Sequence, residues 1–206
     1  MAGDERKLVD RAKRGDAAAF GLLYQRHVDR VFAYIDFRVR DRALAEDLTQ
    51  DVFLQAMRRL DQFEWRGGLA PWLMRIARNT VVDHWRRAGR RPERTQTRAE
   101  AGEMDGDETS LLERLAVTDE DAQFGEAEAA SDRERLVRAA AQLTELQQRV
   151  LALRFAAGLS IQETAEVMER SEGAIKNLQH HAVRGLRRLL EEEASAQDGQ
   201  ARTDTT

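Results

Sequence analysis

Residues 158–190 read GLSIQETAEVMERSEGAIKNLQHHAVRGLRRLL, and this stretch is the most informative part of the sequence. Its pattern predicts a short helix, a tight turn and a longer helix. Ser160 and Ser171 stand where helix N-caps belong, because a serine oxygen can accept the unpaired N–H groups of a first helical turn. Glu172 suits the positive end of the helix dipole. This layout is typical of a helix-turn-helix motif whose second helix is the recognition helix.

The longer helix has an apolar side and a polar side. Apolar residues recur at spacings of three and four, which places them on one stripe: Ile175, Leu178, Ala182, Leu186 and Leu189. The other side carries Gly173, Lys176, Asn177, His180, His181 and Arg184. Such donors can reach base edges in a major groove, while Arg184, Arg187 and Arg188 can reach phosphates. A two-helix hairpin with a solvated charged face remains the alternative for this segment alone.

Composition excludes several classes of protein. The 206-residue chain has no cysteine, so disulfides, thiolate zinc sites and thiol nucleophiles are excluded. Its apolar runs are far shorter than the roughly 20 residues of a membrane span, and its N-terminus is charged, unlike a signal peptide. We therefore expect a cytoplasmic protein without membrane contact of its own. His180 and His181 have no third ligand placed beside them, and no catalytic constellation is recognisable, so we expect no metal, no cofactor and no enzyme activity.

Charge is segregated along the chain, whose formal net charge is -4. Between Arg98 and Arg135, thirteen Asp or Glu residues stand against four Arg. Just before, residues 84–94 (HWRRAGRRPER) hold five Arg and one Glu. Such segregation is expected where one part of a protein meets phosphate and another part is a solvated segment.

Helical spacing dominates both halves, which predicts an all-α protein of two small helical domains joined by a flexible acidic linker. The expected divisions are an N-terminal domain at 1–92, the linker at 93–131, a C-terminal helix-turn-helix domain at 132–192 and a disordered tail at 193–206. In the first domain, Gly15 ends one helix and Asp16 can cap the next. Two more helices are expected, one spanning roughly 42–60 and one starting around Pro71, which suits a first helical turn.

The helix predicted at 42–60 has an outer face that internal packing does not explain. Its buried stripe should consist of Leu44, Leu48, Val52, Ala56 and Leu60. The outer face then carries Asp47, Gln50, Asp51, Leu54 and Arg58. An exposed leucine among acids and amides indicates a docking surface, although single exposed leucines are also common.

The following loop and helix combine basic, amide and aromatic side chains. The residues expected to face inward are Leu73, Ile76, Ala77 and Thr80, and a second stripe carries Arg75, Asn79, Val82 and Arg86, with Arg78 and Trp85 to one side. The loop adds Phe63, Trp65 and Arg66, and its Gly67 and Gly68 allow a close backbone approach to a nucleotide. This combination suits single-stranded or melted DNA, because aromatic rings stack on bases and guanidinium groups hold phosphates. For Phe63 and Trp72, packing in the core is the slightly favoured alternative.

Four segments together resemble the bacterial extracytoplasmic-function sigma factors. They are AEDLTQDVFLQA at 45–56, WLMRIARNTVVDHWRR at 72–87, GLSIQETAEVM at 158–168 and EGAIKNLQHHA at 172–182. The resemblance covers roughly residues 16–92 and 132–190, in the order and spacing of the family. It implies a sigma factor that binds core RNA polymerase and directs promoter-specific transcription initiation by reading minus-35 and minus-10 DNA elements and helping to open the DNA.

The resemblance also assigns residues to roles. Docking on a coiled coil of the largest polymerase subunit falls on Asp47, Gln50, Asp51 and Leu54. Recognition and melting of the minus-10 element falls on Phe63, Trp65, Arg66, Arg75, Arg78, Asn79, Asp83, Arg86 and Arg87. Recognition of the minus-35 element falls on Ser171, Glu172, Gly173, Lys176, Asn177, His180, His181 and Arg184. The chain departs from the family pattern at two places: Leu178-Gln179 stands where many members have Arg-Leu, and Glu169-Arg170 replaces a glycine-containing turn. These departures bear on which minus-35 DNA sequence is recognised more than on whether this helix recognises a minus-35 element.

The implied partners are core RNA polymerase, promoter DNA and an anti-sigma factor. The acidic linker would pass through the polymerase along the path of the RNA, where its charge could mimic a transcript, or it is simply a solvated spacer. Two other classes stay open: a regulator that binds DNA through its C-terminal half without polymerase, and a helical adaptor that binds only proteins. Salt-sensitive DNA affinity would argue against the adaptor, because phosphate contacts weaken steeply with salt.

Overall fold

The structure is a computed structural model that describes residues 2–65, 67–89 and 135–203. Within these ranges all regular structure is helical and no strand occurs, as the sequence predicts. The chain divides into two compact units, one formed by residues 1–94 and 152–175, the other by residues 95–151 and 176–206. The boundaries expected at residues 92 and 131, and the acidic linker between them, lie outside the described residues.

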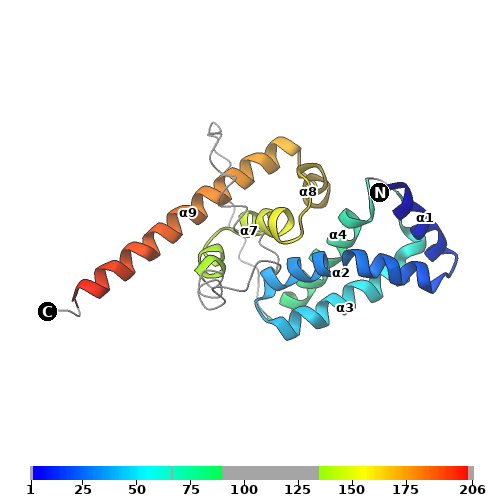
Figure 1. The fold of residues 1–206 in the computed structure, drawn as a ribbon, viewed down its shortest axis with the longest axis horizontal. Coiled ribbons are helices and arrows are strands. Elements are labelled where there is room, and N and C mark those ends of the chain that lie inside the picture. The colour runs from blue at the N-terminus through cyan, green and yellow to red at the C-terminus, as the bar shows by residue number, and fades with distance from the viewer. Residues whose placement is uncertain (1, 66, 90–134, 204–206) are drawn as a thin grey trace, which may run out of the picture. The chain divides into compact units, whose positions relative to one another are not determined.

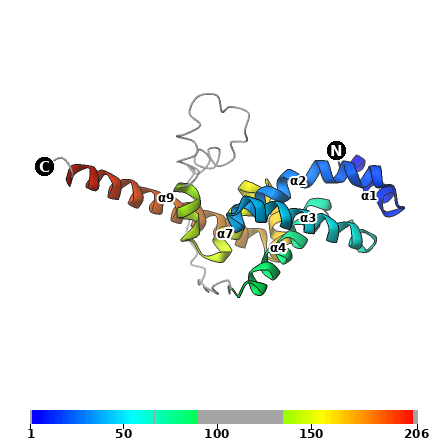
Figure 2. The same ribbon diagram turned by 90° about the horizontal axis from the view of Figure 1, so that it is seen from below.

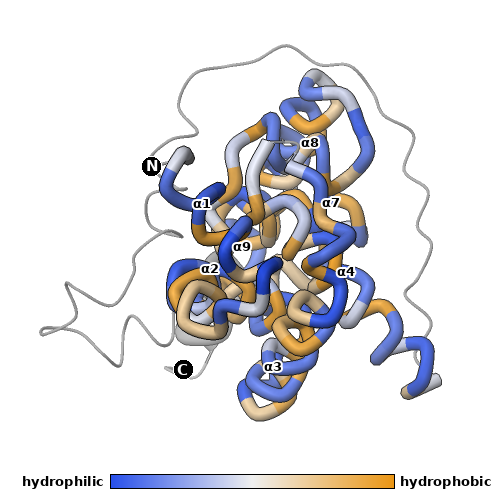
Figure 3. The backbone as a smooth tube through the Cα atoms, turned by 90° about the vertical axis from the view of Figure 1, so that its right-hand side faces the viewer, coloured by the Kyte–Doolittle hydropathy of each residue, from blue (hydrophilic) through white to orange (hydrophobic). Residues whose placement is uncertain are grey.

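The first unit begins with helices α1 (Ala2–Lys13), α2 (Ala17–Val39), α3 (Arg42–Arg59) and α4 (Leu69–Arg87), with a 3-10 turn, η1 (Leu60–Gln62), after α3. Helices α2 and α3 lie side by side, α4 packs against both, and α1 packs against α2 (Figures 1 and 2). Each helix carries both hydrophobic and hydrophilic residues (Figure 3). The fully buried side chains of this part include Val9, Leu23, Val31, Tyr34, Ile35, Val52, Met74 and Val81.

Local sequence signals set the ends of α2 and α3. Gly15 adopts a φ of +87°, which ends α1, and the Asp16 carboxylate accepts the Ala19 N–H at 3.0 Å to begin α2. Asp41 begins α3 in the same way, accepting the Leu44 N–H at 3.1 Å. The predicted Gly15 stop and Asp16 cap are therefore confirmed.

Helix α4 begins two residues earlier than Pro71, which is the third residue of the helix. A proline is tolerated there because the N–H groups of the first helical turn have no partner within the helix. Gly68 is the N-cap residue, with a φ of +127° that a residue with a side chain rarely adopts. Because glycine has no side chain, α4 begins without a side-chain capping bond from its N-cap residue.

The first unit continues with a π-helical turn, η2 (Ala152–Ala156), and helix α8 (Ile161–Met168). The π turn is closed by the Ala157 N–H, which donates to the Ala152 carbonyl at 2.9 Å. Ser160 and Glu163 form a capping box at the start of α8: the Glu163 N–H donates to Ser160 Oγ at 3.1 Å, and the Ser160 N–H donates to Glu163 Oε2 at 2.7 Å. Helix α8 ends at Glu169, whose φ of 56° takes the place of the usual glycine.

The second unit contains a helical segment at 135–141, helix α7 (Glu145–Leu151) and most of α9 (Glu172–Thr203). Gly185 lies against Leu143, and an added Cβ would come within 2.9 Å of the end of the leucine side chain, so an alanine there would require that side chain to shift. Figure 1 shows α9 as one continuous helix. Residues 193–203 are thus helical, where a disordered tail is expected from the sequence; residues such as Ala, Glu and Gln in this segment favour a helix.

No helix in the described residues combines the length and the apolar character that a membrane crossing requires.

Candidate functional site

The predicted outer face of α3 is exposed as expected. Leu48, Val52, Ala56 and Leu60 are buried and Leu44 is half-buried, while Asp47, Gln50, Asp51 and Arg58 are exposed. Leu54 is 46% exposed, and Met57, one turn further along the helix, is 53% exposed. We call Asp47, Gln50, Asp51, Leu54 and Met57 the docking face. Two exposed apolar side chains among acids and amides form a surface suited to binding another protein.

Met57 is not among the residues that the sequence predicts for this face. The signal that could have found it is its spacing of three residues from Leu54, because residues three and four apart are neighbours on a helix surface. An unbranched methionine adapts its shape to a partner, so it adds an apolar contact without imposing a single geometry.

Three aromatic rings shape the segment before α4. Phe63 is 4% exposed, and its ring centroid lies 5.9 Å from that of Trp65 and 5.2 Å from that of Trp72. Of the two roles that the sequence left open for Phe63, DNA contact and core packing, its burial supports core packing. Trp65 and Trp72 are half-exposed. We call residues 63–68 the opening loop; Arg66, predicted as a DNA contact, lies outside the described residues.

Helix α4 presents the predicted basic and amide residues. Leu73, Ile76, Ala77 and Thr80 are buried as predicted, and the Thr80 hydroxyl accepts a bond from the Gln55 side chain of α3 at 3.1 Å. Asn79, Arg86 and Arg87 are exposed, while Arg78 and Asp83 are half-buried.

Some of these side chains already have partners within the first unit. Arg86 pairs with Asp83 at 3.2 Å, and Arg75 pairs with Glu166 at 2.8 Å. Asp83 therefore orients a basic side chain, and a carboxylate would in any case be repelled by phosphate. Trp85, which the sequence placed beside the basic stripe, carries Arg38 over its ring, with the guanidinium carbon 4.8 Å from the centroid.

Helix α9 begins with the residues predicted to contact duplex DNA. Ser171 Oγ accepts the Ala174 N–H at 3.2 Å, so this serine caps α9 as predicted. Ile175, Ala182 and Leu186 of the predicted apolar stripe are buried, and Leu178 and Leu189 are half-buried. The opposite side exposes Glu172, Gly173, Lys176, Asn177 and Arg184, with half-exposed His180 and His181 beside them. Donors thus gather on the first three turns of the helix.

The rings of His180 and His181 meet edge to face, with centroids 5.6 Å apart. Among the described residues, no group of three or more His, Asp or Glu side chains is placed to hold a metal ion.

The chain is similar to known proteins along most of its length. Residues 23–91 match the family model for sigma-70 region 2, and residues 139–188 match the model for sigma-70 region 4. The chain is 42% identical over 191 residues to the ECF RNA polymerase sigma factor BldN of Streptomyces coelicolor, covering 91% of this chain and 66% of BldN. It is 31% identical over 172 residues to the ECF RNA polymerase sigma factor SigX of Bacillus subtilis, covering 84% of each. It thus spans just under two thirds of the length of BldN.

Solved structures show the same fold. CnrH, solved in complex with the cytosolic domain of CnrY, matches with a TM-score of 0.65 at 24% identity, over 91% of this chain and 97% of CnrH. RpoE of Bartonella quintana, solved in complex with the anti-sigma factor NepR, matches with a TM-score of 0.60 at 24% identity, over 84% and 96% of the two chains. Matches to both sigma-70 regions and to SigX along most of its length show that the chain belongs to the ECF sigma factors, the subunits that bind core RNA polymerase and direct promoter-specific transcription initiation.

Proposed function

We propose that this sigma factor uses three separate surfaces for three steps of initiation. The docking face of α3 binds core RNA polymerase, the opening loop and the exposed side of α4 bind the melted minus-10 element, and the first three turns of α9 read the minus-35 element. The observation that carries the proposal is the docking face, where two apolar side chains about half exposed lie beside Asp47, Gln50 and Asp51. A regulator that acts without polymerase, or a protein that only reads duplex DNA, would have no use for this face.

Polymerase docking on α3 is supported by the combination of apolar and acidic groups. Leu54 and Met57 supply area whose removal from water favours association, and Asp47 and Asp51 supply charge that steers a basic partner surface. Binding of labelled protein to core polymerase, measured by fluorescence anisotropy, tests this step. Asp51→Arg should abolish binding, whereas unchanged binding would show that another surface docks.

Recognition of the minus-10 element is supported by the shape of the opening loop. Phe63 is buried and meets the half-exposed Trp65 ring edge to face, so Trp65 is the ring we assign to stacking on an unpaired base. Asn79, Arg86 and Arg87 lie exposed on α4 to hold the strand. Trp65→Ala should reduce permanganate reactivity of minus-10 thymines more than it reduces closed-complex binding; an equal reactivity would contradict this role.

Recognition of the minus-35 element is supported by the donors at the start of α9. Lys176 and Asn177 are exposed one turn into the helix, which is where a recognition helix contacts base edges. Arg184 lies two turns further and suits a phosphate.

We also propose a cytoplasmic location and control by an anti-sigma factor. RpoE, which shares the fold, was solved with such a protein. An inhibitor that covers Leu54 and Met57 would exclude polymerase directly, because the two partners would compete for the same apolar side chains. No catalytic role is assigned to the chain, since polymerase carries out RNA synthesis.

A further inference from the structure

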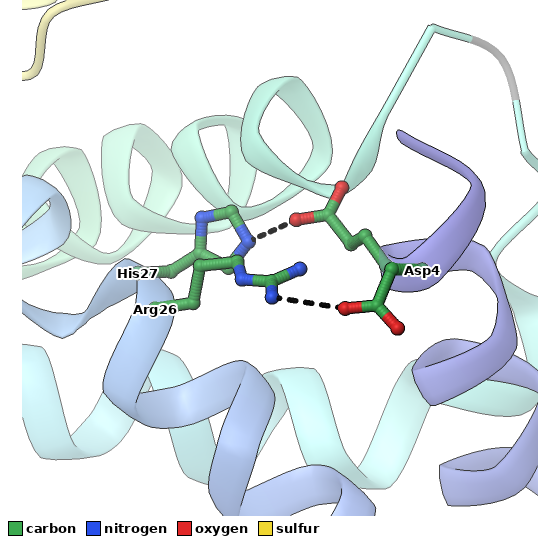
Figure 4. A network of polar contacts seen from close by, with 4 residues as sticks. Asp4, Arg26 and His27 are labelled. Atoms are coloured by element: carbon green, nitrogen blue, oxygen red, sulfur yellow. Dashed lines mark hydrogen bonds and ion pairs between the residues drawn. The ribbon is translucent and has the colours of Figure 1, made fainter. Parts of the chain in front are cut away.

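Helix α2 makes charged contacts with its neighbours at two places. In its first half, Arg26 pairs with Asp4 at 3.3 Å. Next to this pair, His27 Nε2 lies 2.7 Å from Glu5 Oε1, and both contacts join α2 to α1 (Figure 4). At the other end of α2, its last but one residue, Arg38, contacts α4. The second place therefore lies on the helix that we assign to minus-10 DNA.

Arg38 is a buried cation with an aromatic partner. It is 8% exposed, and its guanidinium carbon lies 4.8 Å from the ring centroid of Trp85 on α4. A guanidinium group stacks well on an aromatic face because it is planar and weakly hydrated, and the attraction is stronger when the cation is removed from water. We therefore expect the contact with Arg38 to fix the position of the Trp85 ring.

Trp85 lies in the part of α4 that is not buried. The buried residues of α4 end at Val81, and each residue from 82 to 87 is half-buried or exposed. The end of a helix opens easily where few side chains are packed, because its last carbonyl groups have no partner within the helix. The Trp85 ring, held by Arg38, thus ties the end of α4 to α2.

The same end of α4 carries basic side chains that face solvent. Arg86 and Arg87 follow Trp85 directly and are exposed, and Asp83 pairs with Arg86 at 3.2 Å. Arg38 is too deeply buried to touch DNA itself. It can act on DNA binding only through the position that it gives to the end of α4.

We propose that Arg38 is a positioning residue for promoter binding, which acts through Trp85 to hold the end of α4 where Arg86 and Arg87 contact DNA phosphates. Neither Arg38 nor Trp85 is among the residues that the family resemblance assigns to DNA. The proposal rests on the function proposed above for α4. The contact between Arg38 and Trp85 is a property of the free protein, so it is testable without DNA.

Amide hydrogen exchange tests whether Arg38 holds the end of α4. The Ala88 N–H donates to the His84 carbonyl oxygen at 2.9 Å, so its protection reports the last turn of the helix. Arg38→Met keeps an unbranched side chain and removes the cation, which should accelerate exchange at Ala88 about fivefold. Exchange at Ala77, in the buried part of α4, should stay unchanged. Arg38→Lys, which keeps a cation, should restore most of the protection, and equal exchange at Ala88 in wild type and Arg38→Met would overturn the proposal.

Trp85→Leu tests whether Arg38 acts through the ring. Leucine keeps an apolar side chain at this position and removes the aromatic face. Exchange at Ala88 should accelerate as it does in Arg38→Met, and the double variant should show no further acceleration, because two residues that act through one contact are not additive. Additive effects would mean that Arg38 acts by another route and would overturn the proposal. If Arg38→Met does not fold, Trp85→Leu decides, since unchanged exchange in that variant would equally overturn it.

The salt dependence of DNA binding tests the consequence for promoter recognition. Binding of holoenzyme to a fluorescein-labelled promoter fragment is measured by anisotropy at several salt concentrations. With Arg38→Met, the slope of the logarithm of the binding constant against the logarithm of the salt concentration should decrease in magnitude by about one, because a phosphate contact at the end of α4 is lost. Affinity for core polymerase should stay unchanged.

Arg42→Met is the matched control for charge. It removes the same charge from a side chain that is 82% exposed, at the start of α3, and should leave the slope unchanged. An equal change of slope for Arg38→Met and Arg42→Met would mean that net charge, and not the position of α4, controls the binding, and the proposal would be wrong.

Arg86→Ala and Arg87→Ala separate this proposal from the function of α4. If either variant changes the slope and Arg38→Met does not, α4 binds DNA without help from Arg38, and the proposal is wrong. If neither variant changes the slope, the DNA role proposed for this end of α4 is wrong, and with it the positioning role of Arg38. Accelerated exchange at Ala88 would in that case still establish the contact between α2 and α4.

Discussion

Phe53 and Leu54 are neighbours in the sequence but face in different directions, with 6% of Phe53 and 46% of Leu54 exposed. The Phe53 ring packs edge-on against Tyr24 of α2, with centroids 4.7 Å apart. This contact fixes the rotation of α3 about its own axis. As a result Leu54 and Met57 face solvent, and the docking face is held on a rigid helix.

Leu54→Asp should weaken binding to core polymerase by at least about 2 kcal/mol, because a charge would replace an apolar side chain at the centre of the docking face. Titration of labelled protein with core polymerase measures the loss. Leu22→Asp is the matched control, since Leu22 on α2 is exposed to a similar extent, 49%. Equal losses for the two variants would show that the interface is not centred on α3.

Lys176→Ala should weaken holoenzyme binding to minus-35 duplex DNA by about 1–3 kcal/mol if Lys176 contacts a base. If Lys176 contacts a phosphate instead, the loss of affinity should be similar for all DNA sequences. The slope of the logarithm of the binding constant against the logarithm of the salt concentration should then decrease in magnitude by about one. Binding measured at several salt concentrations on matched and mismatched promoters distinguishes the two. No change in either quantity would remove Lys176 from the interface.

Ser160→Ala should lower the free energy of unfolding by about 1 kcal/mol, because the Glu163 N–H at the start of α8 would lose its acceptor. Ser160→Asp, which keeps an acceptor at the same position, should cost much less. Urea denaturation followed by circular dichroism measures both. Equal destabilisation by the two substitutions would show that the serine acts through packing and not through the cap.

Glu5→Gln should make stability less dependent on pH in acid. The hydrogen bond from His27 lowers the pKa of Glu5 below 4.5, with burial opposing the shift and the charges of His27 and Arg26 adding to it. Because the pKa of Glu5 is lower in the folded state than in the unfolded state, the ionised carboxylate stabilises the fold fully above about pH 4.5. This stabilisation is lost as the pH falls through the folded-state pKa of Glu5.

The difference in unfolding free energy between wild type and Glu5→Gln should therefore be largest above pH 4.5 and shrink below it. Urea denaturation at several pH values between 3 and 7 measures this difference. A gap that stays constant over the whole range would mean that the ionised carboxylate does not stabilise the fold.

Patterns that depend on neighbouring residues could be predicted from the sequence. The stripe of Leu48, Val52, Ala56 and Leu60 has helical spacing, and these residues are buried as expected. Asp16 and Ser160 could be recognised as caps because the acceptor and the N–H it binds lie three residues apart. The spacing of the apolar residues of α9 predicted its exposed side in the same way.

Features that depend on tertiary contacts could not be predicted. Lys13 and Phe63 are fifty residues apart, and no local pattern indicates that the lysine donates a hydrogen bond to the Phe63 carbonyl oxygen. Glu5 and His27 likewise meet only after α1 folds back on α2, so the sequence showed His27 beside the core without its partner. The π turn at Ala152–Ala156 lies in a segment whose composition favours an ordinary α-helix.

Run-off transcription with purified bacterial core polymerase, on a library of promoters from the source genome, shows whether the protein acts as a sigma factor. Initiation is expected at discrete start sites only when the protein is present, and Leu54→Asp should abolish that initiation. Equal transcription with and without the protein, in a preparation that folds and binds polymerase, would contradict it.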